Sequence, residues 1–454
     1  MFGIMTRLGE TQEDTQMSGE HLINVSTKQN RIAEIALKYP GQPLLSLAHH
    51  IDLEWLYAAY LKTRKDGAKG IDGQSGEEYG RNLQNNLKNL LNRFKTGTYR
   101  APAVRRAYIP KGDGKDTRPL GIPTFEDKVL QRAVLMVLSP VWEQEFYEFS
   151  HGFREGRGAH QAIKSLRNHC MQFAGGWVID LDIQKYFDSI DHRLLWDIIK
   201  RRVCDGVITR ILGKWLKAGV MENNQISYLR TGSPQGGVIS PLLSNIYLHE
   251  VLDNWSVREV QPRLKGKSTV VRFADDAVLV FQNKEDALRV LKVLPERFGK
   301  YKLTLHPGKT RLVRFTRPQK NDTDKPGTFT FLGLTLYWGK TRKGKFVVKC
   351  KTDKKKLSKS IKTVYVWLKN NRHRKLKVQW NKLKQSLVGH YAYFGVSFNT
   401  RSLNIFLNQV RNSWFKWLKR RSQKSRFTWA KFQQLSRHYP LPTPRIYHPL
   451  WSKA

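Results

Sequence analysis

Residues 268–281 read STVVRFADDAVLVF, two apolar and β-branched runs on either side of Ala-Asp-Asp. Such runs around a short polar turn predict a β-hairpin with two aspartates at its tip. A second segment, WVIDLDI at 177–183, has the composition of a buried strand and carries Asp180 and Asp182. Because side chains alternate along a strand, both carboxylates point to the same face. Strands mixed with helical segments predict an α+β fold for the middle of the chain.

These aspartates predict a metal site. Asp275 and Asp276 at the hairpin tip, placed near the carboxylates of the strand, would repel one another strongly unless a divalent cation neutralised them. Oxygen-only ligands suit Mg²⁺, and two such ions serve phosphoryl transfer. The alternative for the Asp-Asp pair alone is a turn chosen for its backbone geometry.

The charge of the chain indicates a polyanionic partner. Its 454 residues hold 80 Lys and Arg against 37 Asp and Glu, a net charge of +43. Residues 350–454 carry 25 of these cations, 17 aromatic residues and a single acid, Asp353. Cationic and aromatic residues together are typical of a surface that binds nucleic acid. The alternative is a solvated helical face above an aromatic core.

Other classes of protein are disfavoured. The hydrophobic fraction of 40% allows a buried core, and no stretch approaches the roughly 18 to 20 apolar residues of a membrane span. Cys170, Cys204 and Cys350 lie too far apart in sequence for a disulfide framework or a CxxC metal site. This cysteine usage fits a reducing cytoplasm.

From about residue 44 onward the chain resembles the reverse transcriptases encoded by bacterial group II introns. Eight segments carry the resemblance in the family's order. They are GAKGIDG (67–73), YIPKGDGKDTRPLGIP (108–123), HGFREGRGAHQAI (151–163), VIDLDIQKYFDSIDH (178–192), TGSPQGGVISPLLSNIYL (231–248), RFADDAVLVF (272–281), LHPGKT (305–310) and FTFLGLTL (329–336). The resemblance implies an RNA-directed DNA polymerase.

It also implies a right-hand polymerase fold followed by an all-α basic domain. Residues 1–43 are then a loosely ordered extension that becomes helical near 28–39. We expect fingers with part of the palm at 44–176, and the catalytic palm with an antiparallel sheet at 177–345. The thumb, or maturase domain, is expected at 346–454.

The resemblance assigns the metal ligands. In this family the catalytic aspartate precedes an aromatic residue by five positions, a spacing that Asp182 and Phe187 satisfy and Asp180 does not. Asp182 is therefore the expected ligand, with the backbone carbonyl of Ile183 beside it. Asp275 is the second shared ligand and Asp276 is catalytic. The implied cofactor is a pair of Mg²⁺ ions, with Mn²⁺ as an alternative.

The family's nucleotide-binding positions also have counterparts. Phe187 matches the aromatic gate that excludes a 2′-hydroxyl, with a core phenylalanine as the alternative. Lys111 and Arg118 match residues that hold the triphosphate, and Gln235 matches a glutamine of the nucleotide pocket. Lys309 matches a lysine proposed to protonate pyrophosphate, with a plain surface lysine as the alternative.

One departure from the family lies beside the catalytic aspartates. Phe273 stands where the family usually has tyrosine, so a hydroxyl is lost. Both carboxylates of the following Asp-Asp pair remain, and inactivity is not inferred.

Residues 376–395 resemble the maturase motif. Four of them, Leu383, Leu387, Tyr391 and Phe394, recur at helical spacing and are expected in the core. The cations expected to contact RNA are Lys377, Lys382, Lys384, Arg411, Lys419, Arg420 and Arg421. The implied partners are group II intron RNA, an RNA template with a DNA primer, target DNA and deoxynucleoside triphosphates, without a membrane. The residues after 350 lack the cysteine pairs of an endonuclease, so the primer is expected to be made elsewhere.

Three alternatives remain at this level. The first is an RNA-binding splicing factor without polymerase activity, which loss of the aspartates would mark. The second is a reverse transcriptase of a retron or a diversity-generating element, which usually lacks a maturase-type segment. The third is a generic basic nucleic-acid-binding protein, which does not explain the four aspartates. The expected location is the bacterial cytoplasm, at the nucleoid when the protein is bound to DNA.

Overall fold

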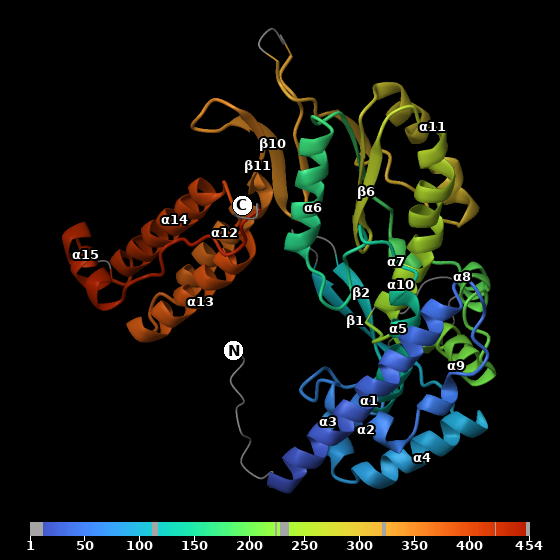
Figure 1. Ribbon diagram of the computed structural model, residues 1–454. Coiled ribbons are helices and arrows are strands. Elements are labelled where there is room, and N and C mark those ends of the chain that lie inside the picture. The colour runs from blue at the N-terminus through green and yellow to red at the C-terminus, as the bar shows by residue number, and fades with distance from the viewer. Residues whose placement is uncertain are drawn as a thin grey trace. The chain divides into compact units, whose positions relative to one another are not determined.

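The computed structural model describes residues 12–110, 117–222, 225–227, 236–319, 324–422 and 424–450, with helices and strands mixed along the chain (Figure 1). Two compact units make up the chain. The first contains Met1–Arg157, Asp182–Arg263 and Val293–His306, and the second contains Gly158–Leu181, Leu264–Lys292 and Pro307–Ala454. Each unit is therefore built from segments that are distant in sequence. The mixed α and β class predicted from the sequence is confirmed.

The first unit is mainly helical. Its α-helices are α1 (Gln12–Lys38), α2 (Leu53–Leu61), α3 (Gly76–Gly80), α4 (Leu83–Thr96), α5 (Phe125–Glu143), α7 (Tyr186–Ser189), α8 (His192–Lys200), α9 (Gly206–Leu216) and α10 (Ser240–Leu248). A 3₁₀ turn, η1 (Ala48–His50), precedes α2. The helix α10 continues through π-helical segments η2 (His249–Asn254) and η3 (Ser256–Val260) and ends in a 3₁₀ turn, η4 (Gln261–Arg263). The long helix α11 (Lys284–Lys300) begins in the second unit and ends in the first.

The helix α5 forms the centre of this unit because apolar residues cover most of its circumference. Val129, Leu130, Val134 and Val137 are all fully buried. Thr124 caps the N-terminus by accepting a hydrogen bond from the backbone N–H of Asp127. Both α1 and α2 pack against α5.

The N-terminal helix corrects one expectation. Residues 1–43 were expected to be loosely ordered up to about residue 28, but α1 starts at Gln12. Val25, Ile32 and Ala36 are each only 1% exposed, at spacings that place them on one face of the helix. Burial of this face against α5 stabilises a helix whose polar composition alone suggested a loose segment.

A small sheet of four strands belongs to the first unit, in the order β2-β1-β4-β5. The strands are β1 (Val104–Pro110), β2 (Thr117–Ile122), β4 (Val220–Glu222) and β5 (Gln225–Ser227). The pairs β1–β2 and β4–β5 are antiparallel, whereas β1 and β4 are parallel.

The second unit holds two antiparallel sheets. The larger has the order β6-β7-β3-β8, and the smaller has the order β11-β10-β9. Their bounds are β3 (Trp177–Leu181), β6 (Ser268–Phe273), β7 (Asp276–Phe281), β8 (Arg311–Arg314), β9 (Phe329–Phe331), β10 (Leu334–Lys340) and β11 (Phe346–Thr352). The hairpin predicted at 268–281 is therefore β6 and β7, and the predicted strand at 177–183 is β3.

One helix covers both sheets. The helix α6 (Ala159–Gln172) contacts β6 and β11. Its buried residues Ile163, Leu166 and Cys170 pack in one apolar cluster with residues of both sheets, including Val178 and Leu336. A shared core thus joins the two sheets of this unit.

The elements that the structure describes after Thr352 are all helices, as predicted. Four helices follow the small sheet, namely α12 (Lys354–Asn370), α13 (Leu376–Phe394), α14 (Thr400–Lys419) and α15 (Trp429–His438). Leu383, Leu387 and Tyr391 of α13 lie in their common core with Trp414 and Phe432. The expectation that these α13 residues are core is confirmed, while Phe394, also expected there, is partly buried against the same cluster. The basic residues of this segment lie around an aromatic interior.

The two units do not follow the three consecutive ranges predicted from the sequence. The boundaries at 44, 177 and 346 describe functional lobes along the chain, whereas the units group residues by contact, so those boundaries stay predictions. The three cysteines are free. Within the described ranges no helix has the length and apolar character needed to span a membrane.

Candidate active site

The β6–β7 hairpin presents the Asp275-Asp276 pair. Phe273 pairs with Asp276 across the hairpin, and Ala274 adopts a left-handed backbone with φ +57°. Such a φ is uncommon for a residue with a side chain and persists only where the surroundings support it. The fully buried guanidinium of Arg272 provides support by donating to the carbonyl of Ala274 at 3.1 Å. The turn therefore holds Asp275 half-buried and Asp276 exposed.

The strand β3 runs beside this hairpin. Leu181 pairs with Ala277 and Asp180 with Val278, so the end of β3 lies next to the start of β7. On its other side Asp180 pairs with Arg311 of β8, whose Nε lies 3.4 Å from the carboxylate. Asp180 thus has a cationic partner within its own sheet. This partner favours a structural role for Asp180, in agreement with the assignment of the metal to the next aspartate.

Asp182 follows β3 directly in sequence and belongs to the first unit. Its carbonyl accepts a hydrogen bond from the N–H of His306 at 2.8 Å, and Ile183 forms an isolated antiparallel bridge with Leu305. Gln184 completes this pairing by donating to Thr304 at 2.8 Å. The backbone around Asp182 is therefore held by the segment that leads into LHPGKT.

A cavity of about 440 Å³ lies beside the hairpin tip within the second unit. Its lining includes Asp180, Asp276, Lys356, Tyr393 and the turn at 330–333. The hydroxyl of Tyr393 donates to the carbonyl of Leu332 at 2.9 Å. Burial and the nearby charge of Asp276 raise the pKa of this hydroxyl, so it remains a donor. Asp276, which the sequence predicts to be catalytic, and Tyr393 of α13 therefore line the same cavity.

Sequence reasoning did not find Lys356 or Tyr393. The segment FTFLGLTL, which carries part of the family resemblance, contains this turn, and the structure shows positive φ at Leu332 and Gly333. No periodicity or spacing indicates that a tyrosine near the end of α13 reaches this turn. Only the tertiary fold brings these residues together.

Two histidines hold the end of α13 beside this cavity. The Nε2 atoms of His160 and His448 lie 2.8 Å from the carbonyl oxygens of Tyr393 and Ala392, respectively. The two rings stack with centroids 3.5 Å apart. Both carbonyls belong to the last turn of the helix, where backbone acceptors lack helical partners. The histidines supply those partners and thereby fix Tyr393.

The short helix α7 carries Phe187. Lys185 precedes α7 with φ +42°, and the hydroxyl of Tyr186 donates to the carbonyl of Ser244 at 2.6 Å. The ring of Phe187 lies 5.4 Å from that of Tyr186 in an edge-on arrangement. Phe187 is half-buried, so its assignment to the aromatic gate stays a prediction beside the alternative of a core phenylalanine.

The segment after Gln235 is held close to β2. Gly236 has φ +112°, and a Cβ atom there would lie 2.6 Å from the carbonyl oxygen of Gly121. Only glycine allows this backbone and this approach. The side chain of Gln131 then accepts from the N–H groups of Val238 and Ile239 at 2.7 and 3.4 Å. Gln235 itself lies outside the described residues.

A buried carboxylate orients Gln131. Asp127 accepts hydrogen bonds from Gln131 at 2.9 Å, from the hydroxyl of Tyr99 at 2.9 Å and from the indole of Trp215 at 2.6 Å. Burial nevertheless raises the pKa of Asp127 to about 6, since loss of water outweighs these donors. Asp127 thus connects α5 with α9 and with the segment after α4, and through Gln131 it supports the approach to α10.

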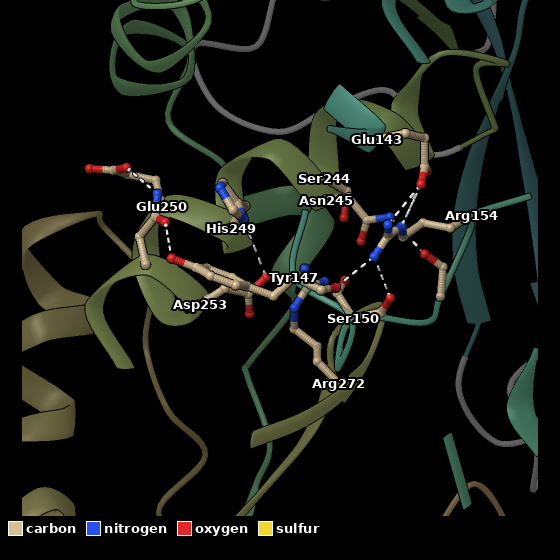
Figure 2. Close-up of polar contacts among 12 residues, drawn as sticks. Glu143, Tyr147, Ser150, Arg154, Ser244, Asn245, His249, Glu250, Asp253 and Arg272 are labelled. Carbon is tan, nitrogen blue, oxygen red and sulfur yellow. Dashed lines mark hydrogen bonds and ion pairs between the residues drawn. The ribbon is translucent and has the colours of Figure 1, made fainter. Parts of the chain in front are cut away.

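Figure 2 shows a second polar cluster of the first unit, around Arg154. Its Nε and Nη2 atoms donate to Oε2 of Glu143 at 2.9 and 2.8 Å, and Nε also lies 3.2 Å from Oε1. Its Nη1 atom donates to the carbonyls of Tyr147 and Ser150 at 2.7 and 2.8 Å. The buried amide of Asn245 on α10 donates to the carbonyl of Gly152 at 2.7 Å. The loop that begins HGFREGR is therefore fastened to α5 and to α10. The sequence marked this segment but gave no role to Arg154.

The other three predicted nucleotide-binding residues are Lys111, Arg118 and Lys309. Lys111 lies outside the described residues. Arg118 lies on β2, where its backbone pairs with Ile109. Lys309 is exposed in the turn that precedes β8. The assignment of these residues to the triphosphate remains a prediction.

The cations predicted to contact RNA differ in their surroundings. Lys377, Lys382 and Lys384 are exposed on α13, and Lys384 lies over the ring of Trp380 at 5.2 Å. Lys419 and Arg420 line a concavity of about 520 Å³ together with Lys416 and Phe415, whereas Arg411 is half-buried on α14.

Arg421 differs from the other predicted RNA contacts. Its guanidinium donates to the carbonyls of Arg372 and Arg374 at 2.7 and 2.8 Å. These bonds tie the end of α14 to the loop between α12 and α13. They favour a structural role for this residue.

The candidate metal ligands are carboxylates, which fit Mg²⁺. Asp275 and Asp276 offer carboxylate oxygens from the hairpin turn. The residues next to them in this turn are neither cysteine nor histidine. Across the described part of the chain, no group of three or more His, Cys, Asp or Glu side chains is gathered closely enough to hold a metal ion.

Residues 109–336 match the family described as reverse transcriptase (RNA-dependent DNA polymerase). This match covers about half of the chain, and the chain belongs to the reverse transcriptase family. Its class of activity, RNA-directed DNA polymerisation, agrees with the prediction from the sequence.

Particular proteins of this family are similar to the chain over longer or shorter segments. Protein YkfC of Escherichia coli K12 is 34% identical over 363 residues, which cover 71% of this chain and 91% of YkfC. The group II intron-encoded protein LtrA of Lactococcus lactis subsp. cremoris is 41% identical over 199 residues, or 43% of this chain and 32% of LtrA. Nuclear intron maturase 4 of Arabidopsis thaliana is 30% identical over 135 residues, or 30% of this chain and 17% of the maturase. These relatives confirm the resemblance to group II intron proteins.

Proposed function

We propose that the chain is a group II intron reverse transcriptase that copies intron RNA into DNA and binds that RNA to assist its splicing and mobility. The observation that carries the proposal is the Asp275-Asp276 pair at the supported tip of a hairpin, with β3 of the same sheet leading into Asp182. In the proposed right-hand layout, 44–176 form the fingers with part of the palm, 177–345 the palm and 346–454 the thumb.

The proposed metal ligands are Asp182, the carbonyl of Ile183 and Asp275, with Asp276 as a further catalytic carboxylate. The bound ions, two Mg²⁺ or Mn²⁺, would activate the primer hydroxyl and stabilise the leaving oxygen. The chain's own part is to hold the carboxylates in place. Arg272 does this for the hairpin turn by donating to Ala274.

The proposed nucleotide pocket uses Lys111, Arg118, Phe187, Gln235 and Lys309. Cations suit the triphosphate because they donate several hydrogen bonds to phosphate oxygens. The half-exposed ring of Phe187 would occupy the space that a ribose 2′-hydroxyl needs. Support for the glutamine comes from its neighbour Gly236, whose backbone approaches β2 too closely for any side chain.

The proposed nucleic-acid surface includes the exposed cations of α13 and α14. All five of these residues are exposed, and two of them, Lys384 and Arg420, also lie over aromatic rings. They are Lys377, Lys382, Lys384, Lys419 and Arg420. Arg411 is retained, whereas Arg421 would act indirectly by holding the loop between α12 and α13. The proposed partners are intron RNA, an RNA template with its DNA primer, and target DNA. We propose action in the bacterial cytoplasm, at the nucleoid when DNA is bound.

Primer extension tests this function. The purified chain is given an RNA template, a DNA primer, deoxynucleoside triphosphates and Mg²⁺, with parallel reactions that contain ribonucleotides or a chelator. The proposal expects DNA product only with deoxynucleotides and free Mg²⁺. Tight binding of RNA without any extension under these conditions would instead identify an RNA-binding splicing factor that has lost the polymerase reaction.

A further inference from the structure

A third concave site lies in the first unit, and none of the residues that line it was assigned a role above. It is a pocket of about 880 Å³ between α8, α9 and the segment that enters β1. This volume is within the range of pockets that hold a ligand of the size of a nucleotide. The argument uses six of its lining residues, which are Arg100, Arg193, Trp196, Arg210, Lys214 and Lys217.

The charge of this pocket has one sign. Five of these six side chains are cationic, and none of the described lining residues carries a carboxylate. Arg100, Arg193 and Lys217 are exposed. Lys214 has a structural task, because its ammonium donates to the carbonyls of Gly97 and Tyr99 at 2.6 Å each. The pocket therefore favours an anion such as a phosphodiester.

The aromatic member of the pocket is held in a defined orientation. The half-buried Trp196 on α8 faces Gly213 on α9, where a Cβ atom would lie 3.4 Å from the indole ring. The ammonium of Lys200 lies 5.2 Å from the ring centroid. An oriented indole beside several cations is the combination that stacks an unpaired base while the phosphates on either side are neutralised.

We propose that the α8–α9 pocket binds an unpaired nucleotide of a folded RNA, with the base on Trp196 and the flanking phosphates on Arg193, Lys217 and Arg100. A base paired within a duplex cannot enter a pocket, whereas loops and bulges of RNA present splayed bases. The RNA as ligand rests on the proposed function. None of the residues that line the pocket is a proposed catalytic residue, so the two proposals can fail independently.

Photo-crosslinking locates the contact directly. The full chain is irradiated with an oligouridylate of about 20 nucleotides that contains one 4-thiouridine, and the modified peptide is identified by mass spectrometry. An oligothymidylate of equal length with 4-thiothymidine and a blunt RNA duplex serve as comparison ligands. The proposal expects crosslinks in the α8 peptide that contains Trp196, stronger for RNA than for DNA. Crosslinks confined to other peptides, or equal crosslinks from the DNA strand, would overturn it.

Two matched pairs of variants measure the contribution of the pocket. Trp196→Ala should weaken oligouridylate binding by about tenfold, whereas Trp196→Phe, which keeps a ring, should retain most of the affinity. Arg193→Glu with Lys217→Glu should weaken binding and flatten its salt dependence. The control is Arg81→Glu with Lys88→Glu, an equal change of charge at exposed positions on or beside α4. An equal loss from both charge pairs would show that bulk charge, and not the pocket, binds the RNA.

Primer extension on a short template and primer is measured in parallel. The proposal expects the pocket variants to extend this substrate at the wild-type rate. Loss of extension in Trp196→Ala with an intact circular dichroism spectrum would assign the pocket to the polymerase channel and overturn the separate site. Inactivity of the wild type together with retained crosslinking would overturn the proposed polymerase function and leave the pocket proposal standing.

Discussion

At the scale of single residues, Phe187 is the residue expected to distinguish deoxyribonucleotides from ribonucleotides. Its ring is half-exposed on α7 and is oriented by contact with Tyr186. We expect Phe187→Ala to admit ribonucleotides, because the space for a 2′-hydroxyl opens. The ratio of kcat/KM for deoxy- over ribonucleotides should fall by about tenfold or more. An unchanged ratio would remove Phe187 from the nucleotide pocket.

Asp127 leads to a prediction about how the stability of the folded protein depends on pH. Its pKa in the folded protein is about 6, against an ordinary value of 3.8. The folded state binds the proton of the Asp127 carboxyl more tightly than the unfolded state does. The contribution of this proton to the free energy of unfolding is therefore fully present below about pH 4. That contribution is lost as the pH rises through 6. The shift corresponds to roughly 3 kcal/mol across this window.

Urea unfolding of wild type and Asp127→Asn between pH 4 and 7 checks this. Asparagine cannot ionise, so the difference in unfolding free energy between the two proteins should change across the window. The wild type should lose stability relative to the variant as the pH rises. Parallel stability curves would show that Asp127 does not titrate with a raised pKa in the folded state.

At the scale of elements, Arg154 fastens a loop to a helix. Its side chain is only 3% exposed and forms a two-pronged ion pair with Glu143. Lysine cannot reproduce the planar fork of donors. We expect Arg154→Lys to lower the free energy of unfolding by about 3 kcal/mol, since Glu143 and two carbonyls lose their donors. The measurement is chemical denaturation.

The neighbouring Arg157→Lys is the matched control for Arg154→Lys. Arg157 donates to the carbonyl of Glu148 at 2.6 Å from a partly exposed position, where water can replace it. Its substitution should change stability by about 0.5 kcal/mol or less. Equal effects of the two substitutions would refute the special role of the buried fork.

A second element-scale prediction concerns Tyr393 on α13. Its hydroxyl holds Leu332, which has φ +50° in the turn at 330–333. Tyr393→Phe removes this bond, worth about 1 kcal/mol, without removing the ring. We expect a folded protein with weaker primer binding and shorter products. Tyr337→Phe on β10, which lies outside the cavity lining, should leave product length unchanged.

At the scale of the whole molecule, local patterns predicted the elements well. The alternation in residues 268–281 and 177–183 identified β6, β7 and β3, because apolar strands of a covered sheet leave a strong signal. The helical spacing of Leu383, Leu387 and Tyr391 likewise identified a core face of α13. Asp275 and Asp276 were placed correctly at a hairpin tip.

What the sequence did not predict depends on contacts between distant segments. The α1 helix begins at Gln12, and its burial against α5 from Val25 onward is a contact between distant segments. The tasks of Arg421, Asp127 and Arg154 follow from carbonyls, indoles and carboxylates many residues away in the chain. A single sequence does not show which distant residues become hydrogen-bond partners in the fold. The α8–α9 pocket could likewise not be predicted from the sequence, because its cations come from separate elements.

The central claim is that the hairpin aspartates catalyse DNA synthesis on RNA. Its most direct test is primer extension by Asp275→Asn with Asp276→Asn, beside Asp324→Asn, an exposed carboxylate paired with Arg314. Loss of metal stabilisation worth several kcal/mol should lower the rate of the aspartate variant by about a thousandfold or more. RNA binding and the Asp324→Asn control should stay at wild-type levels. DNA synthesis at the wild-type rate by the variant would contradict the account.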